Sequence, residues 1–392
     1  MFKLIKNGNV FTPDKLGQCD ILIAADKIVQ IAEKVKAPEN LDVEIIDATG
    51  KFVVPGFVES HTHFLGAGGI DGPSSRSSEA SLSAFARAGI TTAISPLGSD
   101  HIANHLPRLL IKARALEQEG LTTYILTGGF HFPLPNLTGS IITDLSFIDK
   151  IIGVKMAMFE KNASRLTPIE YMNTIRDVRL GAKMGNKAGV IHTHIGERAG
   201  SFEEIAAVYA ELGIPASMFV ATHVNQSSDV LKRTLAGAKR GLCVDITATM
   251  TPDRETTKSA IPPGEAVQLF LDAGIPLANI TMSSDSNAGV DFATGPGTLT
   301  PIDAAYREMK KMILAGFFTL EDALKLITLH PAQRYGLEAS KGSLEVSKAA
   351  DLVLLTKELD IDTVLAKGKF LLKNGQVMAR SVYEESYLRV LQ

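Results

Sequence analysis

Five segments of the sequence carry side chains of the types that bind divalent metal ions. Neutral imidazoles and a carboxylate are what a hydrolytic divalent-metal site requires. A single histidine at a strand end is more often a hydrogen-bonded structural group, and a single aspartate a helix cap, but agreement among several strand ends is hard to explain structurally. The ordered set therefore predicts a metal-dependent enzyme. It consists of His61 and His63, Lys155, His194, His223 and Asp285.

Lys155 is the unusual member, because it lies inside the apolar stretch Ile151–Met158. A charged lysine without a partner is costly in such a strand. Either a carboxylate such as Asp285 or Glu59 neutralises it, or it is converted into a carbamate that bridges two metal ions. The strand alone favours the ion pair.

The elements that must position these residues follow a regular alternation in the middle of the chain. Apolar strands are separated by amphipathic stretches of helix length, which is typical of β/α units around a parallel sheet. Eight such units predict a (β/α)8 TIM barrel, with the active site at the carboxyl ends of the strands. The expected strands are Phe52–Phe57 running on to His61, Thr91–Leu97, Thr122–Leu126, Ile151–Met156, Val190–His194, Met218–His223, Leu242–Ile246 and Ile280–Ser284.

Both ends of the chain show short β-type segments instead. We expect residues 1–54 and 345–392 to pair into one small β-sandwich domain, and residues 55–344 to form the barrel. Because side chains two apart on a strand point the same way, His61 and His63 should face one centre.

Composition excludes several classes of protein. With 45% hydrophobic and 21% charged residues and a net charge of −3, the chain reads as globular, without the basic field that nucleic acid attracts. Cys19 and Cys243 give no disulfide framework, which fits a cytoplasmic protein. We find neither a signal peptide nor an apolar run of about 18 residues, so no membrane association is expected.

The segment Val54–His63, preceded by Ile46–Gly50, resembles the opening of the amidohydrolase superfamily. The resemblance extends over nearly the whole chain and is closest to isoaspartyl (β-aspartyl) dipeptidases. The supporting segments are Leu126–Gly129, Thr138–Ser140, Gly153–Lys155, Thr222–Asn225 and Ser283–Asn287.

This resemblance implies a specific site and reaction. Lys155 would be carboxylated and would bridge two zinc ions bound by the ordered set, which reverses the interpretation of the strand alone. The implied reaction is hydrolysis of the amide bond of an isoaspartyl dipeptide by a water that the two metals activate, with Asp285 as the proton shuttle. Of the two histidines on one strand, His194 fits the family pattern better, and His192 is expected in the core or behind the ligands. The resemblance also suggests a homo-oligomer.

The substrate contacts of the family are mostly replaced in this chain. Its Glu, Tyr, two Arg and Ser positions fall at Ile70, Phe130, Asn162, Gln226 and Gly289. An Arg changed to a neutral residue removes a bidentate carboxylate clamp. The predicted substrate-binding residues are Asp71, Phe130, Arg165 and Gln226, with Arg198 as a further loop cation that could replace a clamp.

Two alternatives remain open beside the dipeptide. The same site could act on a cyclic amide or an N-acyl amino acid, or the chain could be a catalytically silent scaffold. The loop Gly66–Gly72 lacks the dinucleotide fingerprint, because Asp71 occupies the third glycine position, so it is expected to be a substrate loop.

Overall fold

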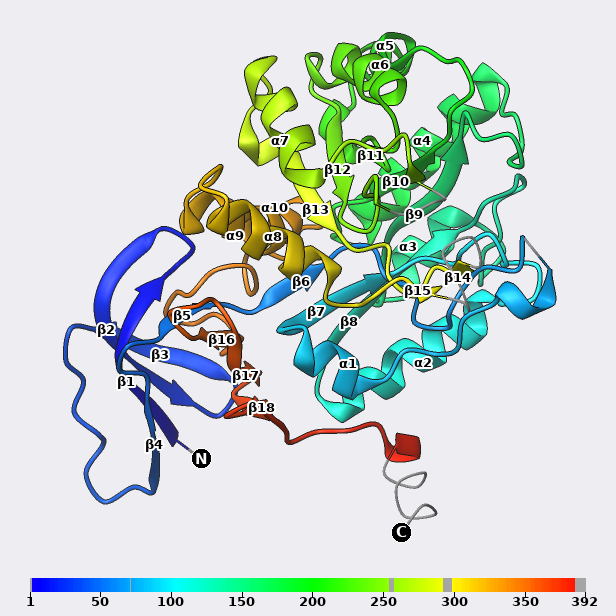
Figure 1. Cartoon of the computed structure of the whole chain (residues 1–392). Helices are drawn as coiled ribbons and strands as arrows, with labels where there is room; N and C mark the ends of the chain where they lie inside the picture. Colours follow the sequence, from blue (N-terminus) through cyan, green and yellow to red (C-terminus); the bar gives the residue numbers. More distant parts are fainter. Residues whose placement is uncertain (1, 71, 254–256, 292–297, 385–392) are drawn as a thin grey trace.

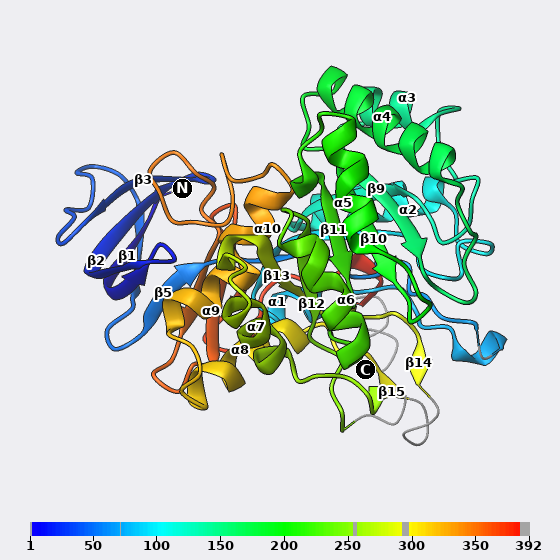
Figure 2. The ribbon, with the colours of Figure 1, turned by 90° about the horizontal axis from the view of Figure 1, so that it is seen from above.

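The computed structural model describes residues 2–70, 72–253, 257–291 and 298–384. A large α/β body and a smaller β body lie side by side (Figures 1 and 2). The chain begins in the smaller body, passes through the larger one and returns to the smaller one. This arrangement confirms the predicted fold class, a TIM barrel with a small sheet domain built from both termini.

The larger body is built on one parallel sheet in which neighbours in sequence are neighbours in space. Its order is β13-β12-β11-β10-β9-β8-β7-β6. Strands buried on both faces explain the near-continuous apolar runs of the sequence. The bounds are β6 (Phe57–Glu59), β7 (Ile90–Ser95), β8 (Thr122–Gly128), β9 (Ile151–Met158), β10 (Val190–Ile195), β11 (Phe219–Thr222), β12 (Cys243–Thr247) and β13 (Ile280–Ser283).

The two outermost strands, β13 and β6, approach each other just beyond their carboxyl ends. Thr62 and Ser286 form a parallel bridge. The His63 backbone N–H donates to the Ser286 carbonyl at 3.0 Å. The buried Glu59 carboxylate accepts the backbone N–H of Ser284 at 3.1 Å. These bonds close the barrel at the rim where the predicted ligands lie.

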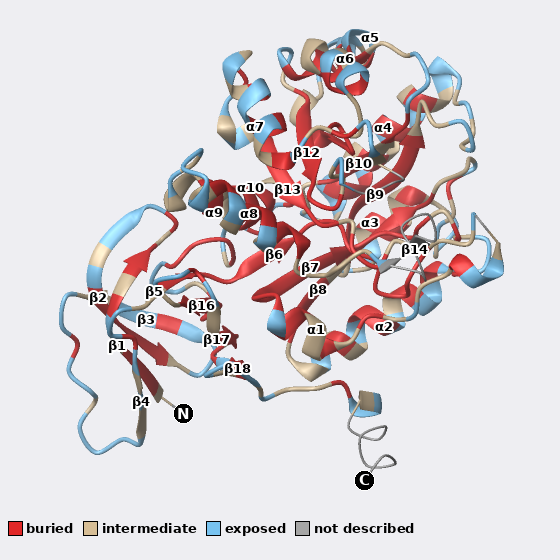
Figure 3. Cartoon of the chain, viewed as in Figure 1, coloured by how far each residue is buried: buried red, intermediate tan, exposed pale blue. Residues whose placement is uncertain are grey.

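Helices cover the outside of the barrel, with buried inner faces and exposed outer faces (Figure 3). The α4 helix begins at Pro168 because Thr167 and Glu170 form a capping box directly before and within its first turn. The bounds are α1 (Leu82–Arg87), α2 (Leu106–Glu119), α3 (Ile141–Phe147), α4 (Pro168–Met184), α5 (Phe202–Glu211), α6 (Ser228–Ala238), α7 (Pro263–Asp272), α8 (Ala304–Leu314), α9 (Leu320–Ile327) and α10 (Leu329–Arg334). Short 3-10 helices lie at η1 (Pro73–Ser75), η2 (Ala216–Met218) and η4 (Leu277–Asn279).

The smaller body is one sheet of nine strands in the order β19-β18-β17-β16-β5-β1-β2-β3, with β4 paired to β1. Residues from both chain ends, including Ile5, Ile21, Leu352 and Leu365, share one apolar core. The bounds are β1 (Phe2–Phe11), β2 (Lys15–Ala24), β3 (Lys27–Ala32), β4 (Val43–Asp47), β5 (Phe52–Pro55), β16 (Leu352–Leu355), β17 (Ile361–Ala366), β18 (Lys369–Lys373) and β19 (Gln376–Val377). A separate two-stranded ribbon consists of β14 (Val290–Asp291) and β15 (Thr298–Leu299).

One expected strand, Phe52–Phe57 running on to His61, is wrong as drawn from the sequence, because the chain changes sheets at Gly56. Before it, β5 pairs with β1 and β16, whereas after it β6 pairs with β7. A β-carbon at Gly56 would lie 2.2 Å from the Thr91 hydroxyl oxygen, so only glycine fits at this crossing. The first barrel strand is therefore short, and His61 and His63 follow it.

Among the described residues, no helix combines the length and the apolar character needed to cross a lipid bilayer.

Candidate metal centre

All six residues of the ordered set meet at the carboxyl end of the barrel. Lys155 and His194 lie in β9 and β10, and the other four follow the ends of β6, β11 and β13. Together they line one cavity of about 140 Å³. The parallel barrel strands therefore bring the set to one rim, which is where the sequence predicts it to lie.

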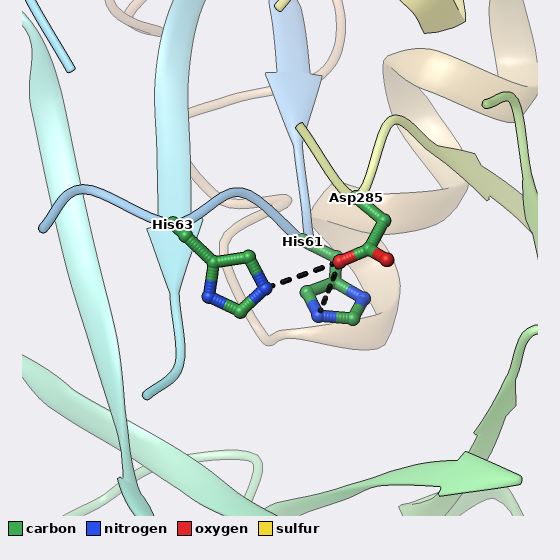
Figure 4. Close-up of side chains that lie close together, drawn as sticks. All are labelled: His61, His63 and Asp285. Carbon is green, nitrogen blue, oxygen red and sulfur yellow. Dashed lines mark hydrogen bonds and ion pairs between the residues drawn. The ribbon is translucent and has the colours of Figure 1, made fainter. Parts of the chain in front are cut away.

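The closest group consists of His61, His63 and Asp285 (Figure 4). Asp285 Oδ1 lies 3.1 Å from His63 Nε2 and 3.3 Å from His61 Nε2. The three ligand atoms lie within 4.8 Å of one another. His223 Nε2 approaches the other carboxylate oxygen of Asp285 at 3.9 Å. Imidazole nitrogens and carboxylate oxygens that converge in this way are a donor set that fits zinc.

Two residues of the set have a left-handed backbone. The φ angle is 69° at His223, directly after β11, and 49° at Asp285, two residues after the end of β13. Such conformations are uncommon for these residue types and persist when the surroundings hold them. His223 is held by its Nδ1, 2.8 Å from the Thr247 hydroxyl. The turns aim both side chains into the cavity.

Lys155 is 3% exposed, and its Nζ lies 3.3 Å from His61 Nε2. Burial lowers the pKa of its ammonium to about 8. In the described part of the chain, no Asp or Glu forms an ion pair with Lys155. The ion pair favoured by the strand alone is therefore wrong: Glu59 binds the backbone N–H groups of His61 and Ser284 instead.

His194 faces His223, with ring centroids 4.6 Å apart. Its Nε2 lies 3.4 Å from Glu160 Oε2, a contact that helps to hold the pKa of Glu160 below its usual value. Glu160 was not predicted from the sequence. Its only signal is its position just after β9, where barrel enzymes place functional groups.

His192 points from the same strand toward the back of the ligands. Its Nε2 lies 3.2 Å from His61 Nδ1, and its Nδ1 lies 2.7 Å from the Tyr335 hydroxyl. Behind it, the fully buried Asp245 accepts hydrogen bonds from Thr222, Thr281 and Ser283.

His61, His192 and Asp245 could also hold a metal ion by distance alone. Their polar atoms are already satisfied, however, and neither His192 nor Asp245 lines the cavity. The first group is therefore the better site, and this one is a supporting network. No sequence pattern around Tyr335 predicted that its hydroxyl would contact His192 in this network.

Burial favours the neutral form of four imidazoles of this region. Burial, with a contribution from the Lys155 charge, lowers the pKa of His61, His192 and His223 well below the ordinary histidine value. Burial also lowers the pKa of His194. Neutral imidazole carries the lone pair that a metal ion needs.

The predicted substrate residues are distributed unevenly. Phe130 lines the metal cavity, with its ring centroid 4.9 Å from that of His194, and Ile70 lines it too. Gln226 is turned away, because its side-chain amide donates to the Ile195 carbonyl. Asp71 lies outside the described residues.

The two loop arginines lie elsewhere. Arg165 and Arg198 line a separate cavity of about 350 Å³ between the segment that follows β9 and helix α5. Glu160 lines this second cavity and contacts His194, which lines the first one. Asn162 is exposed on the same segment, and Gly289 has a φ of 144° that favours glycine.

Comparison with known proteins places this site in a family. The chain is similar to a solved beta-aspartyl dipeptidase from Fervidobacterium islandicum AW-1, with 32% identity, coverage of 96% of this chain and 98% of that chain, and a TM-score of 0.87. That protein has also been solved in complex with a beta-Asp-Leu dipeptide.

Curated relatives are more distant. A dihydroorotase of Bacillus cereus is 24% identical over 93% of this chain and 92% of its own length. An imidazolonepropionase of Acinetobacter baumannii is 26% identical over 82% and 84%.

The model of the amidohydrolase family matches residues 52–371, which include the whole barrel and every residue of the ordered set. The family indicates a hydrolase, and its members act on small molecules. This chain belongs to the amidohydrolase family.

Proposed function

We propose that this chain is a two-zinc amide hydrolase whose first substrate class is the isoaspartyl dipeptides. One observation carries the metal part: six side chains from five strand ends converge on one cavity, and the buried lysine among them forms no ion pair with any described carboxylate. The full-length likeness to a beta-aspartyl dipeptidase supports the substrate class.

The ligands divide into two groups around Lys155. His61, His63 and Asp285 would hold one zinc ion, and His194 and His223 the other. Lys155 would join them as a carbamate, formed when its neutral amine adds carbon dioxide and releases a proton. This change replaces a buried cation by an anion with two oxygen donors, as two neighbouring cations require.

Zinc bound here would lower the pKa of a water molecule and polarise the scissile carbonyl. The side chains of the protein would transfer the proton and exclude bulk water. Asp285 lies at the centre of the site and can take a proton from the attacking water and deliver it to the leaving amine. Phe130 and Leu97 form apolar walls that exclude bulk water from the cavity.

A second substrate class is favoured by the lining of the same cavity. Apart from the ordered set, the wall residues are mostly apolar, including Ile70, Leu97 and Phe130. Both arginine positions of the family carry neutral residues, and the one at Gln226 is tied to the backbone. An uncharged cyclic amide needs no carboxylate clamp and fits such walls.

Turnover by metal-loaded protein separates these candidates. We would measure kcat/KM for β-aspartyl-leucine, for a set of five- and six-membered cyclic amides and for N-acyl amino acids. Highest kcat/KM on the dipeptide supports the first class, and highest kcat/KM on a cyclic amide replaces it by the second. Absence of both turnover and bound metal would revive the silent scaffold.

Asp285→Asn is the matched variant for the catalytic step. It keeps the size of the side chain and an oxygen donor but removes the base. We expect kcat to fall by about 10²- to 10⁴-fold while metal content largely survives. Near-normal turnover by this variant would remove Asp285 from its role as proton shuttle.

A further inference from the structure

One ring nitrogen of His63 lies buried without a partner. Its Nε2 faces Asp285, but Nδ1 has no hydrogen-bond partner among the described residues. A histidine that binds a metal nearly always donates its other N–H to a carboxylate, a carbonyl or water, which fixes the tautomer and the ring orientation. His63 therefore requires a group on its far side.

Asp100 has a carboxylate oxygen that lacks a hydrogen-bond donor among the described residues. The residue is 7% exposed, and its Oδ2 accepts hydrogen bonds from Arg76 at 2.9 Å and from Asn104 at 2.7 Å. Its Oδ1 is buried and has no partner in the described part of the chain. A buried acceptor and a buried donor, each left open, are both costly.

Gly98 brings these two groups to one space. The position that a β-carbon would take on Gly98 lies 3.4 Å from Asp100 Oδ1 and 3.4 Å from His63 Cε1, the ring carbon between the two nitrogens. It also lies 2.5 Å from the β-carbon of Ala67, so a side chain at this position would clash. The carboxylate of Asp100 and the imidazole of His63 therefore approach the same side of Gly98, which only glycine leaves free for them.

Resting on the proposed function, we propose that Asp100 is a positioning residue that accepts the Nδ1 proton of His63, directly or through one water molecule. This holds His63 in the tautomer whose Nε2 lone pair faces the metal site. Oδ2 is already occupied by Arg76 and Asn104, so Oδ1 is the oxygen that remains for His63. Asn104 also lies 3.5 Å from the Gly66 carbonyl, which ties the same carboxylate to the loop that lines the cavity.

His101 is the competing partner, because its Nδ1 is also buried without a hydrogen bond in the described part of the chain. Its ring packs instead beside His131, with centroids 5.2 Å apart, and 3.3 Å from the β-carbon position of Gly129 at the end of β8. It therefore serves as the matched control.

The test compares zinc affinity, measured by competition with a chromophoric chelator, among wild type, Asp100→Asn, Asp100→Ala and His101→Asn. In Asp100→Asn, the amide oxygen must face the donors of Arg76 and Asn104, so the NH₂ group faces His63 and favours the wrong tautomer. We expect a loss of about 10- to 100-fold in affinity for Asp100→Asn. Asp100→Ala should lose less, because water can accept the proton, and His101→Asn should bind as wild type.

A purely structural role predicts the reverse order, because asparagine preserves more contacts than alanine. Affinity of Asp100→Asn equal to or higher than that of Asp100→Ala therefore overturns the proposal. A second readout needs no amide turnover. In zinc-loaded wild type with isotope-labelled histidine, the Nδ1 proton of His63 should be hydrogen-bonded, with a downfield shift and slow exchange that folded Asp100→Ala loses. A fast-exchanging Nδ1 proton in wild type contradicts the proposal even if the protein proves to hydrolyse no amide.

Discussion

Two buried lysines at opposite ends of the barrel, Lys341 and Lys155, differ in whether they form an ion pair with a described acid. Lys341 lies where the barrel meets the small sheet, and it is 6% exposed. Its Nζ pairs with Asp351 Oδ2 at 2.5 Å and donates to the Thr122 hydroxyl at 2.9 Å. Lys155 is buried as deeply at the carboxyl end, where it is surrounded by imidazoles and has no ion pair with a described acid.

The difference teaches how to separate a structural buried charge from a functional one. The Lys341–Asp351 pair satisfies both charges. Asp351 also accepts the backbone N–H of Lys367 in the small sheet region, and Lys341 donates to Thr122 of the barrel strand β8, so the pair joins the two bodies of the molecule. Lys155 contacts His61 but forms no ion pair with a described acid. A buried cation without an ion-pair partner marks a position where a chemical modification or a ligand can complete the site.

The largest effect is expected at Lys155. Lys155→Met removes a buried cation and should leave the unfolding free energy unchanged or slightly increased. It should lower kcat/KM by at least about 10³-fold, because the metals that supply several kcal/mol of transition-state stabilisation lose their bridge. Denaturant unfolding and steady-state kinetics check both parts. A strongly destabilised variant would show that Lys155 is a structural lysine after all.

Lys341→Met should behave in the opposite way. It leaves the Asp351 carboxylate buried without its partner, so the unfolding free energy should fall by about 3–5 kcal/mol. Activity per folded molecule and metal content should remain those of wild type. Loss of bound zinc from folded Lys341→Met would mean that the two ends are not independent.

Replacing both partners sharpens the same comparison. In Lys341→Met combined with Asp351→Leu, no buried charge remains, so most of the lost stability should return. A double-mutant cycle on urea unfolding measures the coupling. Additive losses from the two single substitutions would show that the pair contributes no net interaction.

Metal removal is expected to lower the unfolding free energy less than Lys341→Met does. Bound zinc stabilises the folded chain by mass action, at about 2.7 kcal/mol when the free ion is at 100 times its Kd. Chelation should therefore lower the melting temperature of wild type but not that of Lys155→Met. An equal shift in both proteins would place the bound metal elsewhere.

The sequence predicted the barrel and the ordered set because both depend on local pattern. Strand ends that carry His, Lys or Asp lie at one rim by the geometry of the fold, as for His61 and Asp285. The sheet change at Gly56 could not be predicted, because it depends on pairing with strands that are distant in sequence, β16 on one side and β7 on the other. The same holds for Tyr335 behind His192, and for Arg165, whose loop turns it toward a second cavity.

Anomalous scattering at the zinc edge from a crystal of the metal-loaded protein tests the central claim most directly. The account predicts two peaks in the cavity, one beside His61 and His63 and one beside His194 and His223, with continuous density for a carboxylate on Lys155 Nζ between them. A crystal with no zinc peak in this cavity, and with the Lys155 ammonium bonded to a carboxylate of the protein, would contradict it.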